Sequence, residues 1–186
     1  MKDLQYRVKG SDSKEMLVDL TYKGSSENRK VVIFSHGFKG FKDWGCFPLV
    51  SRCFAEQNFV FVKFNFSHNG TTLESPSDFK DLESFGNNNF SKELYDLDKV
   101  ISWICCKFKS PEITLLGHSR GGGISMLKAA SDERIKNVVS WASPSNFLNR
   151  MPEDRINLGK TRVLYLYTME GPNKICLYIF NFIPIV

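Results

Sequence analysis

The chain has 186 residues, a length that suits one domain and allows a sizeable hydrophobic core. Its hydrophobic share of 42% and charged share of 24% are typical of an ordinary soluble globular protein. The net charge of +5 comes from scattered lysines and arginines with no nucleic-acid motif beside them, so we interpret it as a solvated surface and expect no nucleic-acid partner.

The five cysteines form an odd set without a C-x-x-C pair, which argues against a disulfide framework and against a zinc site. We expect buried free thiols in a reducing compartment. Residues 1–5 contain no apolar signal-peptide region, and the apolar run 175–186 is shorter than the roughly 20 residues that span a bilayer. These features predict a cytoplasmic protein without a membrane partner.

Two strand patterns open the chain. Residues 4–8 and 16–22 alternate apolar and polar side chains, which predicts two antiparallel strands with a turn at 10–13. The continuous β-branched run 31–34 predicts a parallel strand that is buried on both faces. A glycine-rich loop, 35–45, follows this strand.

The middle of the chain changes between helical and extended patterns. Apolar residues recur at helical spacing over 47–54, and 59–64 forms a second buried strand pattern. The polar segment 65–89 predicts a long loop, and long loops within compact domains are usually functional or mobile. One apolar face then predicts an amphipathic helix over 91–108.

A last strand–helix–strand pattern follows, with strands at 113–116 and 137–141 and a helix at 121–130. Strands that alternate with helices in this way predict an α/β fold with a mostly parallel sheet and flanking helices. Catalytic groups on such sheets lie beyond the carboxyl ends of the strands.

The most informative motif is Gly117-His118-Ser119-Arg120-Gly121, directly after the strand at 113–116. A G-x-S-x-G sequence between a strand and a helix is the nucleophile elbow, a sharp turn that raises a serine hydroxyl out of the sheet. We expect Gly117 and Gly121 to leave room for this strained turn, because a side chain at either position would collide across it. Ser119 is therefore the candidate nucleophile.

A second glycine-containing segment, Phe34-Ser35-His36-Gly37-Phe38-Lys39-Gly40, follows another buried strand. With both segments in place, the chain resembles the α/β-hydrolase superfamily, and within it the small bacterial serine hydrolases of the dienelactone-hydrolase and prolyl-oligopeptidase-like group. The resemblance covers roughly residues 1–145. It implies hydrolysis of ester, thioester or peptide bonds in a small molecule or peptide, through an acyl-enzyme on Ser119 and without a metal or organic cofactor.

The resemblance also assigns roles around the serine. The oxyanion hole is expected to use the backbone N–H groups of Phe38 and Arg120. The supporting residues are His36, Gly37, Gly117, His118 and Gly121. His36 is implied to shape the oxyanion loop through hydrogen bonds, rather than to act as a base.

Four further side chains lie close to the two motifs or on nearby loops, and each is given a structural role, a functional role or both. His118 is expected to pack beneath the site, since a neighbour of the serine points elsewhere from the elbow. His68 is interpreted as a solvated loop histidine, with a place in the pocket wall as the alternative. Arg120 is expected to form a surface salt bridge, with contact to an acidic substrate group as the alternative. Trp44 is a candidate wall of an acyl pocket.

One expected residue is missing from the pattern. A serine hydrolase of this type has the chain order Ser, Asp or Glu, then His, yet none of the three histidines follows Ser119. We therefore expect a chain that is truncated and lacks the last strands of the fold. The alternative function is a catalytically inert fragment or pseudoenzyme, at best a binding module.

The C-terminal segment admits two interpretations. Residues 1–145 are predicted to form the hydrolase core and 146–186 a cap-like or truncated segment. Within it, 162–167 is either the seventh strand, with Glu170 near the acid position, or a hairpin inside a cap. The hairpin is favoured, because no helix long enough for a normal crossover precedes it.

Overall fold

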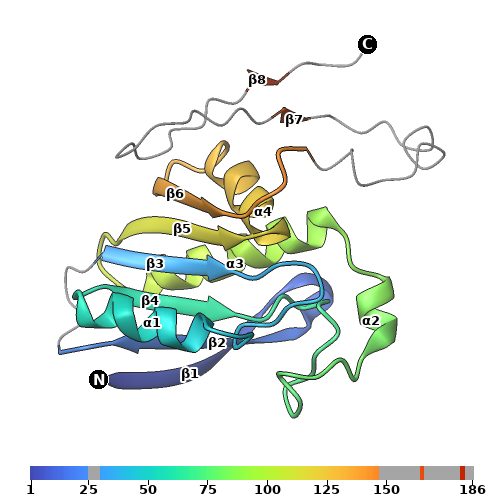
Figure 1. The fold of residues 1–186 in the computed structure, drawn as a ribbon, viewed down its shortest axis with the longest axis horizontal. Helices are drawn as coiled ribbons and strands as arrows, with labels where there is room; N and C mark the ends of the chain where they lie inside the picture. Colours follow the sequence, from blue (N-terminus) through green and yellow to red (C-terminus); the bar gives the residue numbers. More distant parts are fainter. Residues whose placement is uncertain (25–29, 147–163, 166–180, 183–186) are drawn as a thin grey trace.

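The computed structural model describes residues 1–24, 30–146, 164–165 and 181–182, and the following description is confined to these parts. Six strands form one sheet in the order β1-β2-β4-β3-β5-β6 (Figure 1). The strands are β1 (Lys2–Lys9), β2 (Glu15–Tyr22), β3 (Lys30–Ser35), β4 (Val60–Phe64), β5 (Glu112–His118) and β6 (Ile135–Trp141). β2 pairs antiparallel with β1 and β4, whereas β4, β3, β5 and β6 are parallel neighbours. The mostly parallel α/β sheet predicted from the sequence is confirmed.

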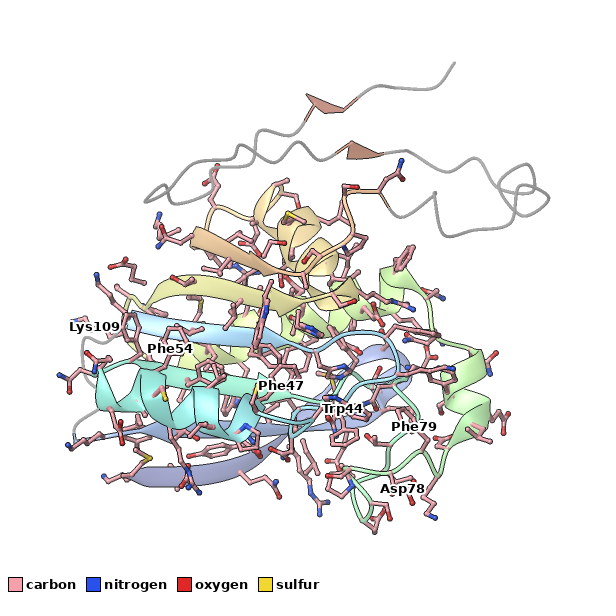
Figure 2. All side chains as sticks on the ribbon, viewed as in Figure 1. Trp44, Phe47, Phe54, Asp78, Phe79 and Lys109 are labelled. Atoms are coloured by element: carbon pink, nitrogen blue, oxygen red, sulfur yellow. The ribbon has the colours of Figure 1, made fainter. Side chains whose placement is uncertain are left out.

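Helices cover both faces of the sheet. The long helices are α1 (Phe47–Glu56), α3 (Phe90–Lys107) and α4 (Arg120–Ala129). Strand β3 shows why helices are needed on both faces, because its side chains point alternately into two hydrophobic clusters on opposite faces of the sheet. Val31 and Ile33 pack in the cluster that α3 and α4 join, whereas Val32 and Phe34 pack against Phe47 of α1. Phe47 and Phe54 of α1 are marked in Figure 2.

The parallel strands set the place of the candidate site. β3, β4 and β5 all point to one edge of the sheet, where the loops after β3 and β4 lie together with α2 (Leu82–Gly86) (Figure 1). Trp44 and Phe79 lie at this edge, whereas Lys109 lies at the opposite one (Figure 2). Residues after different strands thus meet at one end of the molecule.

The segment 65–89 differs from the predicted uninterrupted loop, because it contains α2. The Asp81 carboxylate caps this helix by accepting a hydrogen bond of 3.0 Å from the Ser84 amide. A helix of five residues is too short to show an apolar period, so the sequence pattern could not reveal it.

The cysteines correct another expectation. Cys46, Cys53 and Cys106 are exposed and Cys105 is half-buried, so the prediction of buried thiols is wrong for these four. Cys53 lies on α1 but away from the spaced residues that this helix buries against the sheet. Cys176 lies outside the described residues. None of the described helices is long and apolar enough to cross a bilayer.

Near the C-terminus the described residues form two short strands, β7 (Leu164–Tyr165) and β8 (Asn181–Phe182). They pair antiparallel in a separate two-stranded sheet. This pairing fits the hairpin interpretation of 162–167, whereas a seventh strand would have to join the main sheet. Glu170 lies outside the described residues. The boundary at residue 145 stays a prediction.

Candidate active site

Ser119 is the single residue between β5 and α4, and its backbone has φ 53° and ψ −124°. A positive φ is unfavourable for a serine, so the neighbours have to hold it in place. The Ser119 amide donates a 2.8 Å hydrogen bond to the Trp141 carbonyl at the end of β6. The Ser119 carbonyl accepts a 2.9 Å hydrogen bond from the Gly122 amide in the first turn of α4. The turn is therefore tied to both the neighbouring strand and the following helix.

The glycines beside Ser119 are required by close backbone approach. A Cβ atom on Gly117 would overlap the Gly121 carbonyl and the Gly122 backbone, across the turn. A Cβ atom on Gly121 would overlap the carbonyl groups of Ser35 and His36. The collision expected for Gly121 is thus with the end of β3 rather than across the turn. The elbow lies directly against the neighbouring parallel strand.

The two amides predicted for the oxyanion hole follow two adjacent strands, β3 and β5. β3 and β5 are in parallel register, with Ser35 opposite Gly117, so the residues that follow each strand reach the same edge. A Cβ atom on Gly37 would lie 3.1 Å from the Ser119 Cβ, which shows how closely this loop passes the serine. Within the part of the chain that the structure describes, the amides of Phe38 and Arg120 donate no hydrogen bond. Both donors are thus unpaired near Ser119.

His36 is buried, with 3% of its surface exposed, and both ring nitrogens contact backbone groups. Nε2 accepts a 3.3 Å hydrogen bond from the Phe66 amide, so Nε2 carries no proton. Nδ1 therefore carries the proton and donates it to the Gly37 carbonyl at 2.9 Å. Burial lowers the pKa of His36 to about 4, although the bond to Gly37 opposes this shift. The neutral ring joins the loop after β3 to the loop after β4.

The other two histidines also form no hydrogen bond with the serine. The His118 ring packs 5.5 Å from the Phe47 ring and 5.3 Å from the Trp141 ring, measured between centroids, and burial lowers its pKa. His68 is buried, so the interpretation as a solvated histidine is wrong. Its Nδ1 lies 2.7 Å from Ser67 Oγ, and its Nε2 lies 3.2 Å from Asp12 Oδ2.

All three histidines of the chain are among the described residues, and no hydrogen bond joins any of them to Ser119. A serine hydroxyl is a weak nucleophile until a base accepts its proton. The described residues therefore bring together a serine and two backbone donors, but they place no histidine base beside the hydroxyl.

The Arg120 side chain forms a salt bridge, as expected, but with a buried partner rather than at the surface. Its Nε donates a 2.9 Å hydrogen bond to Glu93 Oε2 in α3, and only 5% of Glu93 is exposed. The guanidinium carbon also lies 4.7 Å from the Phe90 ring centroid and 5.5 Å from that of Phe38. Sequence analysis missed Glu93. Its position four residues before Leu97, on the apolar stripe of the predicted helix, was the available signal.

A cluster of charges anchors the loop after β3. The ammonium group of Lys42 lies 2.5 Å from Asp19 Oδ2 and also contacts Asp43, while Lys63 lies 2.8 Å from the same Asp19 oxygen. Burial alone would lower the pKa of Lys42, but the two carboxylates hold it above its usual value. The Lys42 amide further donates a 2.7 Å bond to Asn65 Oδ1. The loop is therefore joined to β2 and to the loop after β4.

No contact is found between Trp44 and Ser119 within the described part of the chain. Trp44, the candidate pocket wall, is 52% exposed and packs edge-on against Phe41 at 5.2 Å. Two cavities, of about 250 and 310 Å³, open elsewhere on the surface and include neither Ser119 nor the two amides. Among the described residues, no three His, Cys, Asp or Glu side chains converge on a metal site.

Comparisons with known proteins agree with the fold of the chain. A family model described as alpha/beta hydrolase fold matches residues 30–163, whereas no curated protein matches the chain. The α/β hydrolase GrgF from a Penicillium species is 18% identical, with 85% of this chain and 51% of that chain covered at a TM-score of 0.65.

Two further solved structures are similar. The structure of DcsB in complex with its substrate analogue is 22% identical, with 84% of this chain and 49% of that chain covered at a TM-score of 0.65. A dienelactone hydrolase from Anabaena variabilis is 15% identical, with coverages of 76% and 63% and a TM-score of 0.62. The chain thus spans about half the length of GrgF and DcsB.

Proposed function

The chain belongs to the α/β-hydrolase fold family, and on that premise we propose that it is a serine hydrolase of ester or related acyl bonds with Ser119 as the nucleophile. One observation carries the proposal. Ser119 stands at a strained elbow between β5 and α4, and the unpaired amides of Phe38 and Arg120 lie near it. An elbow serine beside two free N–H groups is the arrangement that acyl transfer needs.

The proposed reaction proceeds through an acyl-enzyme. Ser119 Oγ attacks the substrate carbonyl carbon while a solvent water accepts the hydroxyl proton, and the carbonyl electron pair moves to the oxygen. The N–H groups of Phe38 and Arg120 stabilise that negative oxygen by hydrogen bonds. The tetrahedral intermediate collapses, the C–O bond to the alcohol breaks, and the departing alkoxide takes a proton from solvent to leave as the alcohol. Water then attacks the acyl carbon, the bond from that carbon to Ser119 Oγ breaks, the acid is released, and a water proton restores the Ser119 hydroxyl.

A second candidate, an inert hydrolase scaffold that only binds ligands, is favoured by the positions of the histidines. His36 is occupied on both nitrogens, and neither His68 nor His118 forms a hydrogen bond with Ser119. An oxyanion hole and binding alone leave roughly 10³–10⁴-fold catalysis over water, far below an intact triad. For the 186 residues alone, we expect p-nitrophenyl ester turnover below about 1 per second, the low end of typical enzymes.

Covalent labelling separates the two candidates. The full 186-residue chain is incubated with a fluorophosphonate, and the modified residue is mapped by mass spectrometry. The nucleophile assignment predicts an adduct on Ser119 that is lost in Ser119→Ala and kept in the control Ser143→Ala. An adduct on another serine would refute the assignment. A folded chain without any adduct would support the inert scaffold.

A further inference from the structure

The side chain of Arg120 joins the two residues whose amides are proposed to form the oxyanion hole. We propose that the Glu93–Arg120 ion pair is a positioning element, which holds the Phe38 amide at its working distance from the Arg120 amide. This inference rests on the proposed function and deepens it. It gives a role to the side chains of Glu93 and Arg120, because an oxyanion hole made of backbone N–H groups does not by itself require any particular side chain.

The contacts run in one continuous chain from α3 to the oxyanion loop. Glu93 Oε2 accepts the 2.9 Å hydrogen bond from Arg120 Nε, and the guanidinium lies against the Phe90 and Phe38 rings. The Phe38 ring also stacks on the Phe85 ring of α2, with centroids 5.4 Å apart and planes at 28°. Phe38 is nevertheless 56% exposed, so these side-chain contacts are what restrains it.

Backbone hydrogen bonds hold the turn around Phe38 together but do not set its distance to α4. The Gly40 amide donates to the Gly37 carbonyl at 3.1 Å, which closes the turn on itself. The Phe38 amide has no acceptor among the described residues, and Gly37 contributes no side chain. The ring of Phe38 on the guanidinium of Arg120 therefore links the loop after β3 directly to the first residue of α4.

Hydrogen bonds to both oxygens of the Glu93 carboxylate fix the orientation in which it binds the guanidinium. Its second oxygen, Oε1, accepts a 2.8 Å hydrogen bond from Asn88 Nδ2, so both oxygens are used. Burial raises the pKa of Glu93, while the nearby Arg120 charge acts in the opposite direction. A buried, two-sided carboxylate offers little freedom of movement, and loss of one partner leaves the other charge unpaired.

The chemical reason for such a support is the steep dependence of an oxyanion hole on geometry. Its donors have to lie about 2.7–3.1 Å from the developing negative oxygen, and loss of one donor costs about 10²–10³ in rate. A displaced Phe38 amide would stabilise the transition state less, but it would leave the binding of the uncharged reagent unchanged. The expected signature is therefore a lower rate of the covalent step at constant affinity.

The test compares Arg120→Ala, Arg120→Lys and Glu93→Gln with a control, Lys128→Ala. Lys128 lies on α4 like Arg120, and it forms a 2.6 Å salt bridge to Asp98 of α3. Fluorophosphonate labelling of Ser119 is followed at several reagent concentrations, and deuterium exchange of the Gly40 amide, whose bond to the Gly37 carbonyl closes the turn around Phe38, is measured in parallel. We expect Arg120→Ala to lower kinact about 10- to 100-fold with KI unchanged and to speed exchange at Gly40. Arg120→Lys, which keeps the charge without the planar fork, restores only part of the rate.

The outcomes separate this inference from the proposed function. If the wild-type chain takes no label at Ser119, the proposed function fails, and deuterium exchange alone decides the inference. Faster exchange at Gly40 in Arg120→Ala and in the nearly isosteric Glu93→Gln, but not in Lys128→Ala, supports it. Unchanged exchange at Gly40 in a folded Arg120→Ala variant, or a change in KI with constant kinact, overturns it.

Discussion

The buried neutral His36 makes a specific prediction about stability at low pH. The ring is almost fully buried, and its folded-state pKa of about 4 lies below the value of 6.5 expected for an exposed histidine. As the pH falls, the unfolded chain therefore takes up this proton before the folded chain does. The stability associated with neutral His36 is complete above pH 6.5 and is lost between pH 6.5 and about 4.

The magnitude follows from the pKa difference. At about 1.4 kcal/mol per pKa unit, a shift from 6.5 to about 4 corresponds to about 3.5 kcal/mol of unfolding free energy, most of which is lost by pH 4. The cause of the low pKa is burial of the ring, and the Phe66 amide points its N–H at Nε2 from 3.3 Å. Protonation of Nε2 would place two donors against each other inside the protein, where neither can turn to water.

The assay is urea-induced unfolding of the wild-type chain and of His36→Gln at several pH values from 4 to 8. His68 and His118 also have lowered pKa values and affect both proteins alike, so they cancel in the difference. We expect the wild-type advantage at pH 7 to shrink by about 3 kcal/mol by pH 4. A difference that stays constant over this range would refute both the neutral state of His36 and its hydrogen-bond assignment.

Two further predictions concern the packing around the site. Gly121→Ala should lower the unfolding free energy by about 1–3 kcal/mol, because its methyl group overlaps two carbonyl groups at the end of β3, whereas Gly86→Ala, with open space around it, should not. Equal thermal melts of the two variants would contradict the close approach. Asp96→Ala should cost at least about 3 kcal/mol, because the fully buried carboxylate accepts bonds from the Ser11 amide at 2.7 Å, the Ser67 amide at 2.8 Å and the Ser67 hydroxyl at 2.7 Å. Urea unfolding measures this loss, and a cost under about 1 kcal/mol would show that water replaces the carboxylate.

Local sequence patterns were sufficient to predict the strands, the long helices and the elbow. The alternation in β3, with Val31 and Ile33 on one face and Val32 and Phe34 on the other, follows from the period of a strand. The short helix α2 was missed, because its five residues carry no period. Cysteine exposure was also missed, because the face that a helix buries depends on where the helix packs.

Polar residues show most clearly what sequence alone cannot determine. Glu93 and Asp96 lie on the apolar stripe of α3, yet only the folded chain reveals that Arg120 and the Ser11 and Ser67 groups meet them there. Such partners lie up to 85 residues apart along the chain, so no local pattern records them. A buried charge is stable only with its partners in place, and those partners are set by tertiary packing.

The sequence by itself determined the elbow that holds Ser119, the proposed nucleophile, because the G-x-S-x-G motif directly follows a buried strand. It also shows that none of the three histidines follows Ser119. Only the tertiary structure decided where the three existing histidines point. Their positions depend on long-range contacts: His36 with Phe66, His68 with Asp12, and His118 with Phe47. Local sequence sets the shape of a turn, but the distance between a serine and a possible base is set by how whole strands and loops pack.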